Sequence, residues 1–121
     1  MLRVAAAAVV EDGRLLLVSK GSAPDVFYLP GGKPEPGESP DECVRREVRE
    51  ELGAELTALE YHETVHAPAA LEGVPMVMDV FRADLDREPV PASEIAALAW
   101  YRPGAPFAGT LAPAIGSLTL P

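Results

Sequence analysis

Three glutamates in this sequence have the type and spacing to bind a metal ion. Glu47, Glu50 and Glu51 lie at i, i+3 and i+4, so on an α-helix their side chains project from one face, close together. Three like charges there repel, and a divalent cation relieves the repulsion because hard cations prefer carboxylate oxygens. The alternative is a solvated helix face with intrahelical ion pairs such as Glu42–Arg46, the commoner explanation for an acidic helix taken alone.

The residues around these glutamates carry the signals of a helix start and a helix stop. Ser39 fits an N-cap, Pro40 fits the first helical position, and Glu42 completes a capping box with Ser39. Gly53 fits the C-terminal stop. The apolar residues recur at a spacing of four and indicate a buried helix face: Val44, Val48 and Leu52.

The rest of the chain predicts strands packed around that helix. Residues 4–10 and 14–18 flank a Glu-Asp-Gly-Arg turn, which predicts a β-hairpin. Residues 19–37 are rich in glycine and proline and predict a loop. Further extended segments or strands are expected at 26–29, 55–65, 74–83 and 95–101, and a C-terminal helix at 110–118 is weakened by Pro113 and Gly116. Together these elements predict a mixed α/β fold.

Composition excludes several classes of site and partner. The chain has 121 residues and a formal net charge of −9, from 10 basic and 19 acidic residues, which disfavours polymeric nucleic acid as a partner. One cysteine and two histidines cannot supply a disulfide framework or a closed zinc site. No apolar run approaches the ~18 to 20 residues of a membrane span, so no membrane partner is expected and the cytoplasm is the default location. Asparagine and glutamine are absent, so no side-chain amide can read a nucleobase.

The stretch that contains the glutamates resembles the Nudix box. Gly32 is followed after five residues by Glu38, and after seven more by Arg-Glu-Val-Arg-Glu-Glu-Leu-Gly-Ala at 46–54. This matches G-x5-E-x7-R-E-U-x-E-E-x-G-U, with U bulky and aliphatic, at every fixed position; Ala54 is smaller than usual at the last. The preceding Tyr-Leu-Pro-Gly-Gly at 28–32 is similar to the family's lead-in to the box. The resemblance therefore identifies the chain as a Nudix hydrolase of the MutT-like superfamily.

Several structural expectations follow from the resemblance. It implies one Nudix domain over residues 1–121, with the box at 32–54 as a loop–helix–loop catalytic motif. The family fold is an α/β/α sandwich around a mixed β-sheet. A homodimer is a family-level expectation only.

The resemblance also implies roles for named residues. Glu47, Glu50 and Glu51 would bind Mg²⁺ or Mn²⁺, together with the main-chain carbonyl of Gly31. Glu47 is the first candidate in the box for the base that deprotonates the attacking water, and a residue outside the box is the alternative. Arg46 would orient a box glutamate rather than touch the substrate.

Other acidic residues and one aromatic residue keep open roles. Glu38 would be either a partner of Arg46 or an outer metal ligand. Glu94, Glu63 and Glu72 are candidates for a ligand or base outside the box, although an ordinary surface position is the commoner role for each. Tyr28 and Glu94 are weaker candidates for substrate contacts.

The implied activity is hydrolysis of a phosphoanhydride bond in a nucleoside diphosphate linked to another moiety. Pro68 slightly favours ADP-ribose or a nucleotide sugar as the substrate, because ADP-ribose pyrophosphatases tend to carry a proline about this far beyond the box. The alternatives are a nucleoside triphosphate pyrophosphohydrolase with a housecleaning role and a non-catalytic nucleotide-binding module. The module is disfavoured because it would have no reason to keep the repulsive cluster of glutamates.

Overall fold

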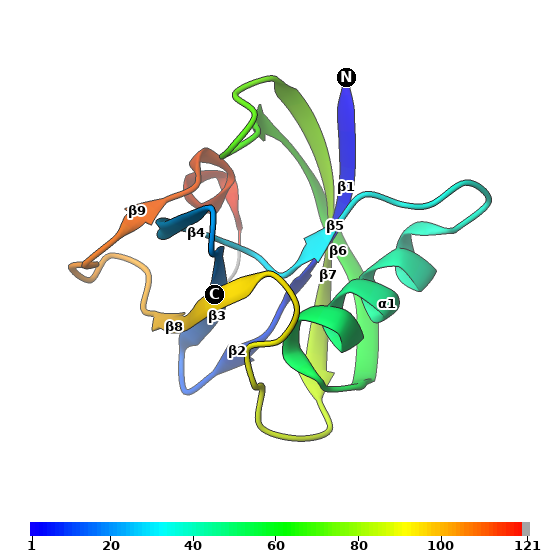
Figure 1. Cartoon of the computed structure of the whole chain (residues 1–121), viewed down its shortest axis with the longest axis horizontal. Helices are drawn as coiled ribbons and strands as arrows, with labels where there is room; N and C mark the ends of the chain where they lie inside the picture. The colour runs from blue at the N-terminus through cyan, green and yellow to red at the C-terminus, as the bar shows by residue number, and fades with distance from the viewer. Residues whose placement is uncertain (120–121) are drawn as a thin grey trace.

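Two β-sheets and one α-helix form the body of the molecule (Figure 1). The computed structural model describes residues 1–119. Its elements are β1 (Leu2–Ala8), β2 (Val10–Glu11), β3 (Arg14–Lys20), β4 (Ala23–Tyr28), β5 (Gly31–Gly32), α1 (Pro40–Leu52), β6 (Leu56–Pro68), β7 (Pro75–Leu85), β8 (Ile95–Tyr101), β9 (Thr110–Leu111) and the 3₁₀-helix η1 (Pro113–Ser117).

Both sheets mix parallel and antiparallel pairs. The first has the order β5-β1-β7-β6, with β1 and β7 parallel and the other neighbours antiparallel. The second has the order β2-β3-β4-β9, with β8 also paired to β3 and with β9 parallel to β4. The predicted mixed α/β fold is confirmed.

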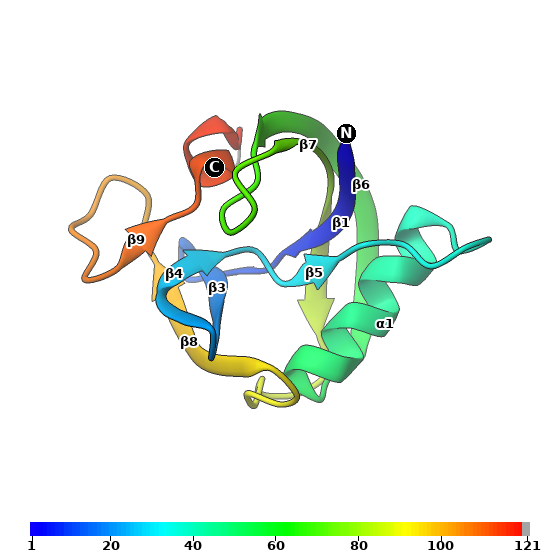
Figure 2. The same cartoon turned by 45° about the horizontal axis from the view of Figure 1, so that its top comes forward.

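Strand β1 separates two hydrophobic clusters. Ala5 and Ala7 pack in one cluster with the buried face of α1, whereas Ala6 and Ala8 pack in the other with η1. Figure 2 shows α1 and the 3₁₀-helix on opposite sides of the strands, which is the layering of an α/β/α sandwich, with a single short turn as its second helical layer. Burial on both faces explains why the N-terminal run is apolar without alternation.

The helix forms where the sequence predicts it, with the predicted caps. The Glu42 N–H donates to Ser39 Oγ at 3.3 Å, and the Ser39 N–H donates to Glu42 Oε1 at 2.9 Å. Gly53 closes the helix at φ 63°, and its N–H donates to the Arg49 carbonyl. The intrahelical pair Glu42–Arg46 does not form, because Glu42 caps the helix and Arg46 binds other carboxylates.

Three expectations about the other elements need correction. The expected N-terminal hairpin is divided between the two sheets, because the chain passes from one to the other at Val9 and only Val10–Glu11 pairs with Arg14–Leu15. The glycine- and proline-rich loop contains a six-residue strand, β4, rather than a short extended piece at 26–29. The C-terminal segment forms β9 and a five-residue 3₁₀-helix instead of one helix over 110–118, since proline and glycine interrupt it.

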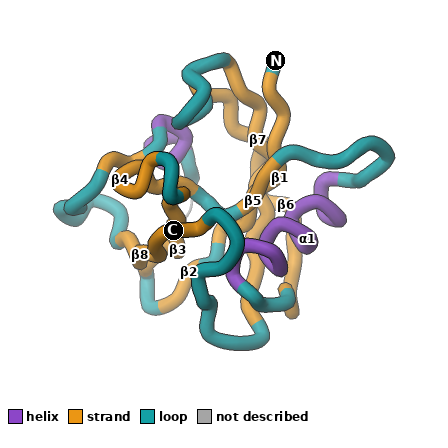
Figure 3. The backbone as a smooth tube through the Cα atoms, viewed as in Figure 1, coloured by secondary structure: helices purple, strands orange, loops and turns teal. Residues whose placement is uncertain are grey.

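One glycine fixes the path into the loop between β5 and α1. Gly31 in β5 pairs with Ala6 of β1 at φ 152°, and a Cβ there would collide with the Ala5 carbonyl oxygen. The backbone of β5 can therefore lie tightly against β1, directly beside α1. The long loop that follows β5 projects from the body before it enters α1 (Figure 3). No helix within residues 1–119 is both long and apolar enough to span a membrane.

Candidate active site

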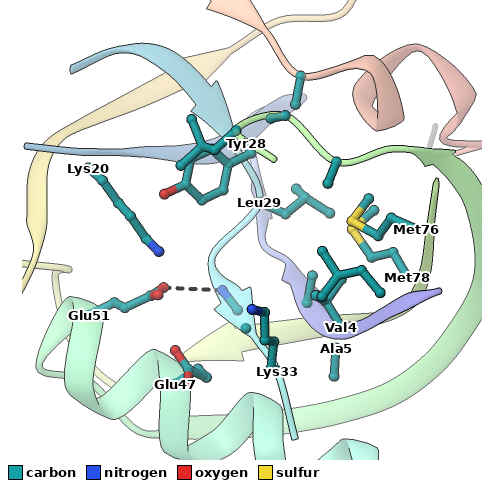
Figure 4. A pocket seen from close by; sticks show the side chains of 18 of the residues that line it. Val4, Ala5, Lys20, Tyr28, Leu29, Lys33, Glu47, Glu51, Met76 and Met78 are labelled. Atoms are coloured by element: carbon teal, nitrogen blue, oxygen red, sulfur yellow. Dashed lines mark hydrogen bonds between the residues drawn. The ribbon is translucent and has the colours of Figure 1, made fainter. Parts of the chain in front are cut away.

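Glu51 is a buried carboxylate on the inner face of α1. The residue is only 6% exposed, and its Oε1 accepts a hydrogen bond from the Gly31 N–H at 3.1 Å (dashed in Figure 4). Burial, and after it the negative charge of Glu47, raise the pKa of Glu51 to about 8. A carboxylate in this position is costly to ionise unless a cation comes beside it.

Arg46 holds the other two glutamates of the predicted cluster. Its Nη1 donates to Glu47 Oε1 at 2.8 Å and lies 3.4 Å from Glu50 Oε2. Its Nε and Nη2 donate to the two oxygens of Glu38 at 2.8 and 2.9 Å. These bonds from Arg46 lower the pKa of Glu38 to about 2. Glu38 therefore forms an ion pair with Arg46, which corresponds to one of its two predicted positions, and Arg46 also binds the box glutamate Glu47.

The carboxylates of Glu47, Glu50 and Glu51 line one end of a pocket of about 480 Å³. The predicted site residues that line it are Gly31, Arg46, Glu47, Glu50, Glu51, Tyr28, Glu72 and Glu94. The other end is walled by small or flexible apolar side chains: Leu2, Val4, Leu29, Ala69, Ala70, Met76, Met78, Ala112, Ala114 and Ile115. Figure 4 shows Leu29, Met76 and Met78 on the side away from Glu51 and Glu47. The pocket thus has a charged end and an apolar end, and its size suits one small molecule.

Glu63 does not join this site. It lies in β6, where its Oε2 accepts a hydrogen bond from the Thr119 N–H at 2.8 Å and lies 3.3 Å from His62 Nε2. Pro68 also stays outside the lining, at the end of β6 opposite Pro75. Of the three acids considered outside the box, the fold brings Glu72 and Glu94 to the pocket.

The loop between β7 and β8 carries Glu94 to the pocket mouth. The N–H of Ala92 donates to the Glu51 carbonyl at 3.0 Å, which ties the loop to the C-terminal end of α1. Ser93 then turns the chain at φ 56°, in the left-handed region. Glu94 is exposed and lies 3.6 Å from the Lys20 ammonium.

Sequence reasoning missed the two lysines. Lys20, at the end of β3, and Lys33, after β5, both line the pocket, and they are the only lysines in the chain. In Figure 4 both reach toward the end occupied by the glutamates. The sequence did carry a signal for them, because in a chain of net charge −9 lysine occurs at these two positions only.

The side chains of the charged end suit a divalent cation. Glu47, Glu50 and Glu51 line the same pocket, and Glu51 is buried beside the carboxylate of Glu47, whose negative charge raises the Glu51 pKa, so a hard cation would relieve a repulsion that the fold imposes. Within residues 1–119, no three His, Cys, Asp or Glu side chains already converge closely enough to hold a metal ion. Two of the three carboxylates, Glu47 and Glu50, are bonded to Arg46 instead.

Comparison with known proteins gives one consistent result. The model of the NUDIX domain family matches residues 1–118. A CTP pyrophosphohydrolase of Escherichia coli (strain K12) is 42% identical over 64 residues, which cover 50% of this chain and 47% of that protein. The match therefore spans about half the length of this curated relative.

Solved structures resemble nearly the whole fold. The solution structure of the E. coli ORF135 protein superposes with a TM-score of 0.75 and 32% identity, covering 98% of this chain and 85% of that one. The crystal structure of a MutT NUDIX hydrolase from Burkholderia pseudomallei gives a TM-score of 0.72 and 33% identity over 84% of this chain and 82% of that one.

Proposed function

The chain belongs to the NUDIX domain family, as a Nudix hydrolase, and we propose that it hydrolyses a phosphoanhydride bond of a nucleotide with a bound divalent metal ion. The observation that supports this most is the buried carboxylate of Glu51 beside Glu47, at the charged end of a pocket whose other end is apolar. Such a pair has little structural use without a cation, and a cation there meets the phosphates of a nucleotide whose nucleoside occupies the apolar end.

The residues of the charged end have separate roles in this proposal: metal binding, phosphate binding and positioning. Glu47, Glu50 and Glu51, with the Gly31 carbonyl, would hold Mg²⁺ or Mn²⁺, which when bound neutralises phosphate oxygens and acidifies a water molecule. Lys20 and Lys33 add positive charge for the phosphates. Arg46 keeps Glu47 oriented through the 2.8 Å bond, and Glu38 keeps Arg46 in place.

Three acids that line the pocket are candidates for the general base: Glu47, Glu72 and Glu94. Glu47 lies in the pocket and is the candidate from the box, while Glu94 lies at the mouth on a loop tied to α1. We propose Glu47, because a base must lie within hydrogen-bond reach of the attacking water and Glu94 is exposed and faces Lys20.

Two substrate classes remain, and we place nucleoside triphosphates first. Pro68, which favours ADP-ribose or a nucleotide sugar in the sequence, does not line the pocket. The curated relative matched over half of this chain is named a CTP pyrophosphohydrolase, which supports a triphosphate. Nucleoside diphosphates linked to another moiety are the second candidate, because Glu50 and Glu94 line the pocket with exposed side chains, so a second moiety beside them can extend into solvent.

A substrate panel tests the proposal. The purified chain is incubated with Mg²⁺ or Mn²⁺ and the common nucleoside triphosphates, ADP-ribose and nucleotide sugars, and the products are identified by phosphorus NMR. Nucleoside monophosphate with pyrophosphate supports the first class, and nucleoside monophosphate with a phosphorylated second moiety supports the second. Turnover of none of these compounds with either metal would refute the proposal.

A pair of variants tests the metal site. Glu51→Gln keeps the size of the side chain and removes its charge, so it is expected to abolish turnover and weaken Mn²⁺ binding measured by paramagnetic relaxation. Glu60→Gln, on the exposed part of β6 outside the pocket, is the matched control and is expected to keep both. Full activity in Glu51→Gln would overturn the metal assignment.

A further inference from the structure

Tyr28 places an unsatisfied hydroxyl inside the pocket wall. The oxygen is fully buried and has no hydrogen-bond partner among residues 1–119. Buried hydroxyls are nearly always bonded, so one that is unpaired in the wall of a binding pocket indicates a partner supplied by the ligand. We propose that the Tyr28 hydroxyl donates a hydrogen bond to an oxygen of the phosphate that adjoins the nucleoside, an inference that rests on the proposed nucleotide hydrolysis.

The strand and the core fix the position of this side chain. Tyr28 ends β4, where it pairs with Val18 of β3, and its ring packs against both hydrophobic clusters of the molecule. Its neighbour Phe27 is engaged elsewhere, with its ring centroid 5.2 Å from that of Phe107. The tyrosine ring is therefore held between the charged end and the apolar end of the pocket, and it cannot rotate toward another hydrogen-bond partner.

The direction of the hydroxyl favours a phosphate over a base. In Figure 4 the Tyr28 oxygen points away from the apolar end, where Leu29 and Met76 lie, and toward the space between Lys20 and Glu51. That space belongs to the charged end, where the phosphates of a nucleotide would lie. If the nucleoside occupies the apolar end, the phosphate nearest to it lies where the two ends of the pocket meet.

The charges around Tyr28 make its hydroxyl a donor. Burial first, and then the carboxylates of Glu51, Glu94 and Glu72, raise the pKa of Tyr28 well above its ordinary value, so the group stays protonated. Carboxylates offer no hydrogen-bond donors to a phosphate. In Figure 4 the Lys20 ammonium points into the same space as the Tyr28 hydroxyl. The neutral hydroxyl thus adds a donor for an anionic phosphate oxygen at a place lined by carboxylates.

Tyr28→Phe tests the inference because it removes one oxygen and nothing else. Loss of a hydrogen bond to a charged acceptor is expected to lower kcat/KM by about 10- to 100-fold for the best nucleotide. The thermal midpoint is expected to stay unchanged or rise by a few degrees, since no bond within the protein is lost. A merely structural tyrosine would show the reverse, with a lower midpoint and unchanged kinetics.

A matched control removes a hydroxyl that is bonded and outside the pocket. Tyr61 is 55% exposed, and its hydroxyl lies 2.6 Å from Thr64 Oγ1. Tyr61→Phe is expected to leave kcat/KM unchanged. Because the two variants differ only in where the lost oxygen lay, a general effect of the substitution would appear in both.

Binding without metal or turnover identifies the contacted group. Affinities for a nucleoside monophosphate and for the same nucleoside, CMP with cytidine and AMP with adenosine, are measured by NMR titration. Tyr28→Phe is expected to weaken monophosphate binding about tenfold and to leave nucleoside binding unchanged. Equal weakening for both ligands would assign the hydroxyl to the base or ribose and overturn the inference, as would no change for either. Turnover by the wild type in the same preparation shows that the proposed function itself still holds.

Discussion

The raised pKa of Glu51 predicts that the metal-free protein loses stability as the pH rises through neutrality. The unfolded chain releases the Glu51 proton near pH 4.5, whereas the folded chain keeps it until about pH 8. Between these values the folded state binds more protons than the unfolded state, so the free energy of unfolding must fall as the pH increases. Burial of Glu51 thus lowers the free energy of unfolding least below pH 4.5 and most above pH 8.

The size of the effect follows from the same two values. One decade of pH is worth about 1.4 kcal/mol for a single proton. The distance from 4.5 to about 8 sets a ceiling of about 5 kcal/mol, and sharing of charge with Glu47 lowers the expected loss to about 2 to 4 kcal/mol. For a domain of this size that is a large part of the total stability.

Urea unfolding at pH 5.5, 7 and 8.5, with a chelator present, measures this loss. The interval avoids the groups with lowered pKa values, Glu38 and Asp86, whose ion pairs stabilise the fold above their unfolded values and are lost only as the pH falls toward about 2. Glu51→Gln is expected to flatten the profile and to raise stability at pH 8.5. Mg²⁺ is expected to stabilise the wild type at pH 8.5, by about 2.7 kcal/mol at a hundred times its dissociation constant, and to stabilise Glu51→Gln by less at the same concentration.

A neighbouring glutamate supplies the control for general charge effects. Glu50 is on the same helix but its side chain is 53% exposed, so Glu50→Gln removes the same charge without removing a buried one. It is expected to keep the slope of the wild type. A flat wild-type profile, or equal slopes for the wild type and Glu51→Gln, would refute the argument that this carboxylate is buried at a cost.

Three further substitutions test the supports of the site. Ser39→Ala removes the cap of α1 and is expected to lower the free energy of unfolding by about 1 kcal/mol in urea titrations, with the activity of the folded enzyme unchanged. Gly32→Ala would place a Cβ 2.6 Å from the Glu47 carboxyl carbon, so weaker Mn²⁺ binding and slower turnover are expected while the far-UV circular dichroism stays native. Arg46→Lys cannot keep the two-pronged bond to Glu38 and is expected to lower kcat by about tenfold or more; an unchanged kcat would contradict its orienting role.

The helix and its glutamates were predictable because their determinants are local. The capping box lies within four residues, and the glycine stop within one turn of the last apolar position. Residues three and four apart share a helix face by geometry alone, so the spacing of Glu47, Glu50 and Glu51 already predicts that they lie together.

The parts that escaped prediction depend on contacts far apart in the sequence. The division of the first hairpin at Val9 follows from pairing of β1 with β7, more than seventy residues later, as Leu2 with Met76 shows. Whether an acid outside the box reaches the pocket depends on loop paths, which is why Glu94 and Glu63 could not be separated by residue type. The Tyr28 hydroxyl lacks a partner because of how the folded chain packs around it, and this packing cannot be read from the sequence.

The distribution of charge bears on which phosphate compounds the site admits. The chain carries a net charge of −9, yet both of its lysines line the pocket. Charges separated by more than about 8 Å are largely screened at physiological ionic strength, so a phosphate inside the pocket responds mainly to the charges that line it, where Lys20, Lys33 and a bound cation have to offset the repulsion of the glutamates. A polymer must also lie along the acidic surface, where each further phosphate meets repulsion without a matching cation. The arrangement therefore favours a small nucleotide over a long nucleic acid through local attraction and general repulsion acting together.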